Sequence, residues 1–354
     1  MGDTLSVALI GAGYVSGDHA AAWRAQPGAS IRCVVDADPH RARSLAADAG
    51  IDEWATDFES LIDRPDIDVV DICLPPRLHL EATVAFLDAG KHVLLEKPFV
   101  TSLDEARRLL DAEQNSTTTL MVAENWPYSS VARRVRRLVD DGVLGELFML
   151  RAHNESALYM EHDGALAPAL QASSAVGGFT MSAGIHNINL ASSLMGGIES
   201  IYACSPDRSP SAAPFVERDA AMTARFGNGG VGVMHFTGRS LHLGERRLAF
   251  ALYGTRGMAE FDILHGRVAF TVDGERTQIE ERSPSMGFAE EIAHFCECLA
   301  GGATPMTSVR QQLEPLATVL AAYQSMYERR EVHPADLLAQ AGLSTVGTGG
   351  AIDV

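Results

Sequence analysis

Near its N-terminus the chain reads Val7-Ala8-Leu9-Ile10-Gly11-Ala12-Gly13-Tyr14-Val15-Ser16, which predicts a buried strand, a tight turn and the start of a helix. The two glycines stand where a turn and a closely approaching pyrophosphate leave no room for a side chain. An Ala-rich helix is expected from Asp18 to Arg24. Ser16 replaces the third glycine of the GxGxxG pattern, so this pattern indicates a dinucleotide site only with support from its surroundings.

A second strand supplies that support. Ile31 to Val35 is apolar and ends in Asp36, at the distance from the glycines where a carboxylate binds a ribose diol. Asp36 would repel a 2′-phosphate, which favours NAD over NADP, although Arg41 offers a partner for a phosphate. The alternative interpretation is that Asp36 caps the helix that follows Pro39.

The first third of the chain alternates apolar strands with helical patterns. Further strands are expected at Val69 to Leu74, His92 to Leu95 and Leu120 to Ala123, and helices at His79 to Ala89 and Ser102 to Asp111. This alternation predicts an α/β fold with a doubly wound parallel sheet. We therefore place a dinucleotide-binding domain at residues 1–124.

The strand at His92 to Leu95 runs into Glu96-Lys97-Pro98, so the charged pair emerges at the carboxyl end of a buried strand. Ligands of open α/β sheets bind at that edge. Of the 28 Lys and Arg residues, only Lys91 and Lys97 are lysine. A lysine ammonium is a tunable proton donor and an arginine guanidinium is not. Lys97 is therefore a candidate for proton transfer.

Residues 125–354 are expected to form a second domain. From Ile198 to Ile279 the chain is rich in short strands joined by connections such as Asn228-Gly229-Gly230 and Asp273-Gly274, which predict an antiparallel sheet. A sheet of this kind with one free face commonly forms an oligomer interface. We expect a homodimer or homotetramer that assembles through this sheet.

A second chemical centre is expected where the Gly177-Gly178 turn opens a helix. At helical spacing, Ser182, His186 and Asn189 share one face of that helix. The alternative for His186 is a buried, hydrogen-bonded helix histidine, and small polar residues such as Ser182 often serve only in packing.

Composition excludes several classes of partner. The net charge of −18 and the pI near 5.0 over 354 residues disfavour nucleic acid and anionic membrane surfaces. The five cysteines form no CxxC pair, and the chain has no span of about 20 apolar residues. A cytoplasmic location is expected. Glu161-His162-Asp163 offers three metal-capable side chains, but adjacent residues rarely converge on one ion, so no metal site is expected.

Several motifs follow one another in order along the chain: Gly11-x-Gly13 with His19, Asp36, Cys73-Leu74-Pro75-Pro76 with His79, Gly90-Lys91-His92, and Glu96-Lys97-Pro98. Together they resemble the Gfo/Idh/MocA family of nicotinamide-dependent sugar and cyclitol oxidoreductases. The resemblance implies a Rossmann domain followed by an α/β domain with a large, mostly antiparallel sheet. It places Lys97 beside the nicotinamide, in contact with the reacting oxygen of the substrate.

The resemblance also implies two sets of binding residues. The expected contacts to NAD are Gly11, Ala12, Gly13, Tyr14 and Val15 at the pyrophosphate, Asp36 at the adenosine ribose, and Leu74, Pro75, His79, Glu96 and Lys97 toward the nicotinamide. The expected contacts to a polyhydroxylated substrate are Lys97, Asn125, His186 and Asn189.

The second centre departs from the family pattern, in which an Asp precedes the His by four residues and another Asp often follows. Here Ser182 and Asn189 occupy those two positions. A hydroxyl holds an imidazole in one tautomer less well than a carboxylate does. We therefore expect His186 to be a weaker base, with Ser182 as a further catalytic candidate and Lys97 carrying more of the proton chemistry.

The leading hypothesis is an NAD(P)-dependent dehydrogenase or ketoreductase that acts on a secondary alcohol of a sugar, amino sugar or cyclitol. A second hypothesis is an NAD-dependent hydrolase or lyase with no net redox change, for which Tyr128, Tyr159 and Glu161 are candidate bases. A third is a family member that binds NAD without catalysis, as the serines at positions 16 and 182 suggest.

Overall fold

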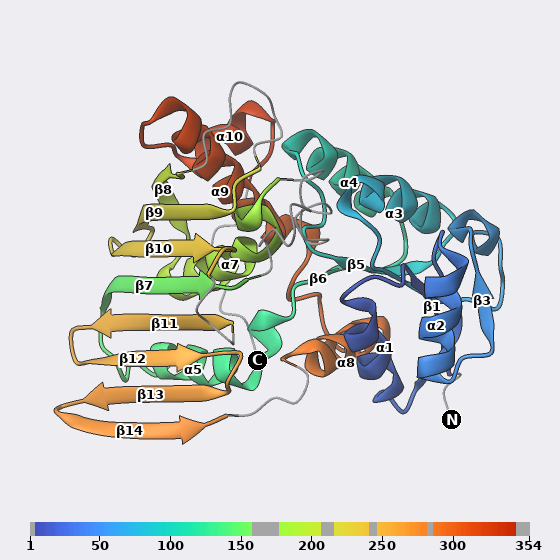
Figure 1. Ribbon diagram of the computed structural model, residues 1–354, viewed down its shortest axis with the longest axis horizontal. Helices are drawn as coiled ribbons and strands as arrows, with labels where there is room; N and C mark the ends of the chain where they lie inside the picture. The colour runs from blue at the N-terminus through green and yellow to red at the C-terminus, as the bar shows by residue number, and fades with distance from the viewer. Residues whose placement is uncertain (1–3, 158–176, 207–215, 241–245, 282–285, 345–354) are drawn as a thin grey trace. The chain divides into compact units, whose positions relative to one another are not determined.

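A computed structural model of the chain describes residues 4–157, 177–206, 216–240, 246–281 and 286–344. The described chain divides into two compact units (Figure 1). The first unit comprises Met1–Val100, Asp104–Tyr128 and Gly287–Gln312, and the second comprises Thr101–Leu103, Ser129–Met286 and Leu313–Val354.

The first unit contains a six-stranded parallel sheet in the order β3-β2-β1-β4-β5-β6. Its strands are β1 (Leu5–Ile10), β2 (Ala29–Val35), β3 (Glu53–Ala55), β4 (Val69–Ile72), β5 (His92–Glu96) and β6 (Leu120–Ala123). The strand order reverses between β1 and β4, which is the point where open α/β sheets bind their ligands. The predicted doubly wound parallel sheet is confirmed.

Helices and short turns connect these strands. They are α1 (Ser16–Arg24), η1 (Phe58–Leu61), α2 (Pro39–Ala49), η2 (Pro76–Leu78), α3 (His79–Asp88), α4 (Leu103–Asn115) and η3 (Trp126–Tyr128). At the start of helix α2, the Asp38 side chain accepts hydrogen bonds from the backbone N–H groups of His40 and Arg41. The helix is closed by Gly50 in the left-handed conformation. Asp38 rather than Asp36 therefore caps this helix, so the capping alternative for Asp36 is wrong.

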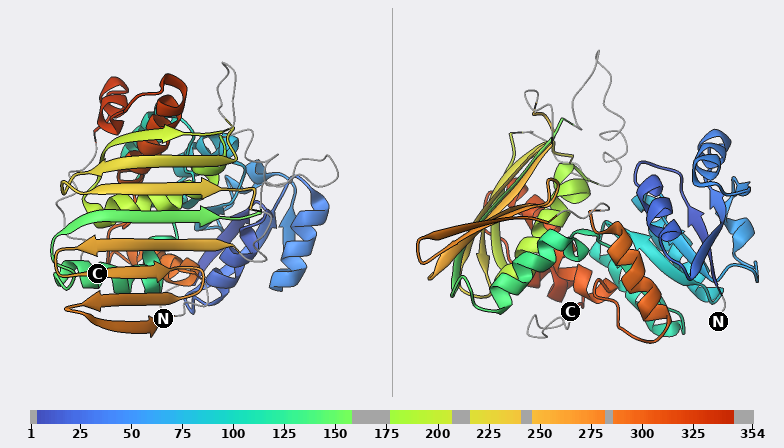
Figure 2. Two further views of the ribbon diagram at one scale, coloured as in Figure 1. Left: turned by 60° about the vertical axis from the view of Figure 1, so that its left-hand side comes forward. Right: turned by 90° about the horizontal axis from the view of Figure 1, so that it is seen from below.

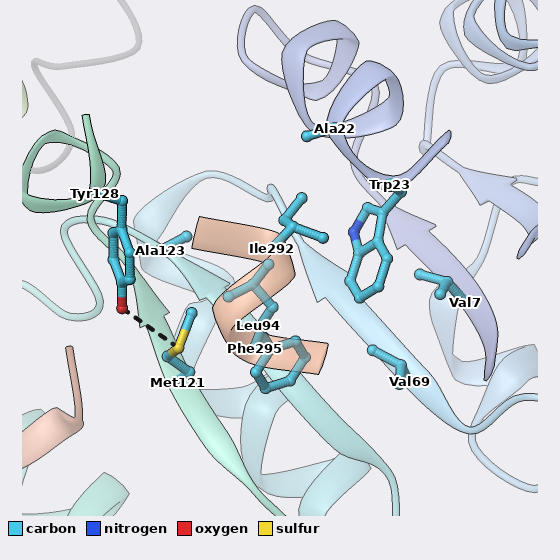
Figure 3. Packing of buried hydrophobic residues seen from close by; sticks show 10 residues of the cluster. All are labelled: Val7, Ala22, Trp23, Val69, Leu94, Met121, Ala123, Tyr128, Ile292 and Phe295. Carbon is cyan, nitrogen blue, oxygen red and sulfur yellow. Dashed lines mark hydrogen bonds between the residues drawn. The ribbon is translucent and has the colours of Figure 1, made fainter. Parts of the chain in front are cut away.

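Helix α8 (Phe288–Leu299) belongs to the first unit. We expected residues 125–354 to form one second domain, but α8 lies with the parallel sheet because its apolar face is buried there. Ile292 and Phe295 pack in a cluster of fully or nearly fully buried residues that includes Trp23 and Leu94 (Figure 3). The rings of Trp23 and Phe295 meet edge to face with centroids 6.3 Å apart.

The second unit contains an eight-stranded sheet in the order β14-β13-β12-β11-β7-β10-β9-β8. Its strands are β7 (Leu147–Glu155), β8 (Ile198–Cys204), β9 (Asp219–Phe226), β10 (Val231–Thr237), β11 (Arg247–Gly254), β12 (Gly257–Asp262), β13 (Arg267–Val272) and β14 (Glu275–Glu280). Neighbouring strands are antiparallel except β7 and β10, which are parallel. The predicted large, mostly antiparallel sheet is confirmed.

Helices of the second unit lie along one face of this sheet (Figure 2). They are α5 (Ser130–Asp140), the π-turn η4 (Thr180–Gly184), α7 (Ile185–Met195), α9 (Val309–Glu328) and α10 (Pro334–Gln340). Burial alternates along β9 and β10, as expected for strands covered on one side. The opposite face, which we call the outer sheet face, exposes the apolar side chains of Tyr202, Val231 and Val233.

Among the described helices, none has the length and apolar character needed to cross a membrane.

Gly11 is the position in the first unit where a side chain is least tolerable. Its φ is +107°, and a Cβ there would collide with the carbonyl oxygen of Cys73. We predict that Gly11→Ala destabilises the protein by about 1–3 kcal/mol, measured by urea unfolding. Gly13→Ala is the matched control, because no atom lies within 4 Å of a Cβ built at Gly13. Equal stability of the two variants would contradict this assignment.

Candidate active site

The glycine turn after β1 is held by three hydrogen bonds that its backbone N–H groups donate. Gly11 N–H donates to the Val35 carbonyl at 2.7 Å, Ala12 N–H to Asp36 Oδ2 at 2.9 Å, and Gly13 N–H to Ser16 Oγ at 3.0 Å. Ser16, at the position of the third glycine, is fully buried, and its hydroxyl stabilises the turn. The serine is therefore compatible with a dinucleotide-binding turn. The backbone at Gly13 stays open on its outer side.

The carboxylate of Asp36 lies beside the glycine turn, as the sequence predicted. It is largely buried and accepts N–H groups from Ala12 and Asp38, each at 2.9 Å. Arg41 pairs with Asp36 Oδ1 at 2.9 Å through a half-exposed side chain. The end of β2 is thus tied to the turn after β1, and a carboxylate is held where an adenosine ribose is expected.

His79 is the first residue of α3, and its ring faces backbone carbonyl groups. Its ring is fully buried, with Nε2 2.7 Å from the Leu74 carbonyl oxygen and Nδ1 3.0 Å from that of Pro98. Burial lowers the pKa of His79, which favours the neutral ring. The contact of His79 with NAD stays a prediction, and both ring nitrogens face backbone carbonyl oxygens. His79 links the loops that follow β4 and β5, including the turn at Leu74 and Pro75.

Strand β5 ends at Glu96, and Lys97 follows at the carboxyl edge of the sheet. Lys97 Nζ lies 3.8 Å from Glu96 Oε1, and its side chain is 17% exposed. The Lys97–Pro98 peptide bond is cis. The other carboxylate oxygen, Glu96 Oε2, lies 3.5 Å from Nε2 of His19 on α1. Glu96 therefore has a basic group on each side.

Behind His19 lies Asp71, a fully buried carboxylate on β4. Asp71 Oδ2 accepts hydrogen bonds from His19 Nδ1 at 2.8 Å and from Trp23 Nε1 at 2.7 Å. Burial lowers the pKa of His19, but the charges and hydrogen bonds of Asp71 and Cys73 together bring the net pKa well above the usual value. Our sequence reasoning quoted His19 only as part of a motif and missed Asp71, because an acidic residue inside an apolar strand carries no recognisable signature.

Within the described residues, His19, Asp71 and Cys73 form a group whose metal-capable atoms lie within 4.8 Å of one another. The Asp71 oxygen nearest His19 already accepts two hydrogen bonds, and indole N–H is not a metal ligand. The group is therefore better described as a hydrogen-bonded cluster than as a metal site. Glu161-His162-Asp163 lies outside the described residues, as does Tyr159.

Two more buried carboxyl groups adjoin Lys97 and His19. Burial raises the pKa of Glu124 to about 7, with the charge of Lys97 opposing the rise. Burial also raises the pKa of Glu291, on α8, well above its usual value. Sequence reasoning missed both. Glu124 directly follows the buried strand β6 and so lies at the carboxyl edge, the same signal that identified Glu96. Nothing in the sequence connects Glu291 to this region.

Asn125 and Tyr128 follow Glu124 in the first unit, and both are buried. The hydroxyl of Tyr128 lies 3.7 Å from Met121 Sδ and 3.1 Å from Thr307 Oγ1. Burial raises the pKa of Tyr128 well above its usual value. A phenol that resists ionisation in this way is a poor general base, so Tyr128 does not suit the role suggested for it in a hydrolase or lyase.

In the second unit, His186 and Asn189 lie on α7 and are both 7% exposed. Ser182 does not share their regular α-helical spacing, because it lies in the π-turn η4. Its hydroxyl lies 3.5 Å from the Phe179 carbonyl oxygen. The predicted common face of Ser182, His186 and Asn189 stays a prediction, with residues 180–184 wound as a π-turn.

The helix segment that carries His186 is anchored at its N-terminal end by the buried Glu217 and the partly buried Tyr323. Glu217 Oε1 accepts the Thr180 N–H at 2.5 Å, while Tyr323 Oη accepts the N–H groups of Gly178 at 3.0 Å and Met181 at 3.1 Å. Burial raises the pKa of Glu217 to about 7. Sequence reasoning missed both anchors, because they come from distant segments and match no motif.

Comparison with known proteins agrees with this geometry. Residues 5–124 match the family model described as "Oxidoreductase family, NAD-binding Rossmann fold", and residues 132–260 match the "GFO/IDH/MocA C-terminal domain". The chain is 28% identical to the levoglucosan dehydrogenase of Pseudarthrobacter phenanthrenivorans over 287 residues, which is 73% of each chain. It is 27% identical to the D-apiose dehydrogenase of Paraburkholderia graminis over 98% of this chain and 94% of that one.

Among solved structures, a levoglucosan dehydrogenase in complex with NADH and levoglucosan superimposes with a TM-score of 0.85 and 23% identity. The match covers 94% of this chain and 99% of that one, and at this identity it indicates a common fold. The two family models together match residues 5–124 and 132–260, which is most of the chain. The chain therefore belongs to the Gfo/Idh/MocA family of oxidoreductases.

Proposed function

We propose that this protein is an NAD-dependent dehydrogenase or ketoreductase that interconverts a secondary alcohol and a ketone on a sugar, amino sugar or cyclitol. The observation that carries the proposal is the Glu96–Lys97 ion pair at the carboxyl edge of the parallel sheet, the same edge that holds the glycine turn and Asp36. Relatives named levoglucosan dehydrogenase and D-apiose dehydrogenase support this substrate class.

The residues of the first unit fit a bound NAD. The open backbone at Gly13 leaves space for a pyrophosphate over residues 11–15, and Asp36 presents a carboxylate to a ribose diol. Pro75 and Glu96 would border the nicotinamide. When bound, NAD supplies the acceptor for a hydride. Asp36 disfavours a 2′-phosphate, and its ion pair with Arg41 occupies the nearby cation, so NAD is preferred over NADP.

In this proposal the Lys97 amine accepts the proton of the substrate alcohol during oxidation, and the Lys97 ammonium donates that proton to the ketone oxygen during reduction. Glu96 orients Lys97. Asn125 in the first unit and, separately, His186 and Asn189 in the second unit are the further residues proposed to bind substrate hydroxyls. Glu217 and Tyr323 hold the segment that presents His186. Because Ser182 stands where the family has a carboxylate, Lys97 carries the larger share of proton transfer.

Replacing the Lys97 amine tests this assignment. We predict that Lys97→Ala lowers turnover by about 10²–10⁴-fold, the usual contribution of a general acid or base, while NAD binding is retained. Turnover is measured by reduced-nicotinamide absorbance over a panel of pyranoses, cyclitols and their keto forms.

The matched variant Lys97→Arg keeps the positive charge beside Glu96 but cannot exchange its proton near neutral pH. It should lose turnover as Lys97→Ala does. Near-normal rates in both variants, on a substrate that the wild type oxidises, would contradict the role of Lys97.

Cofactor preference tests Asp36. We predict that Asp36→Ala reduces the ratio of kcat/KM with NAD to kcat/KM with NADP, because the carboxylate that repels a 2′-phosphate is gone. Asp38→Ala is the control, since it removes the cap of α2 at a cost of about 1 kcal/mol but no ribose contact. If only the Asp38 variant changed the ratio, the assignment of Asp36 would be wrong.

We further propose a homodimer or homotetramer that assembles through the outer sheet face, in the cytoplasm. The exposed Tyr202, Val231 and Val233 support an interface, and the five free cysteines suit a reducing compartment.

A charge placed on this face tests the interface. Val233→Asp is expected to give monomers in size-exclusion chromatography with light scattering, because a buried unpaired carboxylate strongly disfavours association. Gln114→Asp, at an exposed position of α4, should leave the assembly unchanged. An unchanged mass for Val233→Asp would place the interface elsewhere.

A further inference from the structure

Four ionisable side chains form a row in the first unit, which we call the charge row: Asp71, His19, Glu96 and Lys97. Successive groups lie 2.8 Å apart from Asp71 Oδ2 to His19 Nδ1, 3.5 Å from His19 Nε2 to Glu96 Oε2, and 3.8 Å from Glu96 Oε1 to Lys97 Nζ. Asp71 and His19 are fully buried, while Glu96 and Lys97 lie at the edge of the solvent-accessible surface. The row therefore runs from the interior of the unit to the proposed catalytic amine.

The charges along this row alternate when His19 is protonated. Burial is the largest influence on the pKa of His19 and lowers it, but Asp71 and Cys73 together raise it well above its usual value, which favours the imidazolium. Trp23 Nε1 donates a second hydrogen bond to the same Asp71 oxygen and supports the ionised carboxylate (the Trp23 ring is seen in Figure 3). Asp71 and Trp23 together hold His19 as a buried cation.

A protonated His19 weakens the stabilisation that the Glu96 carboxylate gives to the Lys97 ammonium. A carboxylate beside a single ammonium stabilises the charged amine and makes it harder to deprotonate. Here the same carboxylate also faces a second cation on its opposite oxygen. We propose that His19 is a positioning residue that divides the negative charge of Glu96 between two cations, so that Lys97 releases its proton more readily than a lysine paired with Glu96 alone.

Four other titratable groups in the described part of the first unit face the charge row. One is His79 on α3, near Glu96, whose ring favours its neutral form because burial lowers its pKa. Cys73, after β4, stays a thiol because burial raises its pKa to about 12, and Glu291 on α8 favours its neutral form for the same reason. Glu124, after β6, has its pKa raised by burial to about 7. Ionised Glu124 would stabilise the ammonium of Lys97, and His19 acts in the opposite direction.

This inference rests on the proposed function, in which Lys97 exchanges a proton with the substrate oxygen. Its test nevertheless needs no turnover. The chain has only two lysines, so carbon-13 labelling of lysine Cε gives two signals whose shifts follow amine protonation. Lys91 is the internal reference, because its amine donates to the carbonyl oxygens of Arg64 and Ile67 and lies outside the charge row.

We expect His19→Gln to move the titration midpoint of the Lys97 signal upward by about one unit, because it removes a cation beside Glu96. Asp71→Asn should give a smaller rise. It removes the negative charge that keeps His19 protonated, so one positive and one negative charge are lost together and their effects on Lys97 partly cancel. Trp23→Phe removes a hydrogen bond and no charge, so it should leave the midpoint nearly unchanged. The Lys91 signal should not move in any of these variants.

An unmoved Lys97 midpoint in folded His19→Gln and Asp71→Asn proteins would overturn the inference. If neither variant folds, nitrogen-15 NMR of the wild-type histidines decides, because a neutral His19 ring at pH 7 would also overturn it. A wild type that oxidises no polyol contradicts the proposed function but leaves the titration result intact. If turnover depends on Lys97 but the titration midpoint of the Lys97 signal does not move, only the proposed role of His19 is contradicted.

Discussion

The carboxylate of Glu96 is the group on which the polar interior of the first unit depends. It lies between His19 and Lys97 and links a buried hydrogen-bonded cluster to the carboxyl edge of the sheet. Buried charges are costly unless they are paired, so the arrangement is stable only when donors and carboxylates alternate. The strand order supplies this pairing, because β4 and β5 are neighbours and α1 places His19 between Asp71 and Glu96.

The glycine turn obeys a related constraint of close packing. Gly11 passes so near the Cys73 carbonyl that no side chain fits, which fixes the turn against the end of β4. Asp36 then ties β2 to the same turn. In the second unit, Glu217 and Tyr323 satisfy the first N–H groups of the segment that carries His186. Each unit therefore presents its chemical groups from a backbone whose hydrogen bonds are made within that unit.

The sequence was most informative where a candidate functional residue follows directly after a strand. The strands before Gly11, Asp36 and Glu96 were expected, and the parallel sheet brings their carboxyl ends together. Tertiary contacts decide what the sequence alone leaves open. His79 has the right position in the chain, but its ring turns inward to two carbonyl groups. Regular helical spacing placed Ser182 beside His186, whereas the chain forms a π-turn there. Glu291 could not be assigned to this cluster from the sequence, because it lies there only through the packing of α8 against the other elements of the first unit.

The central claim is that the protein transfers a hydride from a polyol carbon to the nicotinamide and leaves the substrate oxidised. The most direct measurement is mass spectrometry of cofactor and sugar after reaction with a polyol deuterated at its reacting carbon. We predict that deuterium appears in NADH while a ketone accumulates in equal amount. Cleavage or elimination of the substrate with no net NADH, or NADH formed without deuterium, would contradict that claim.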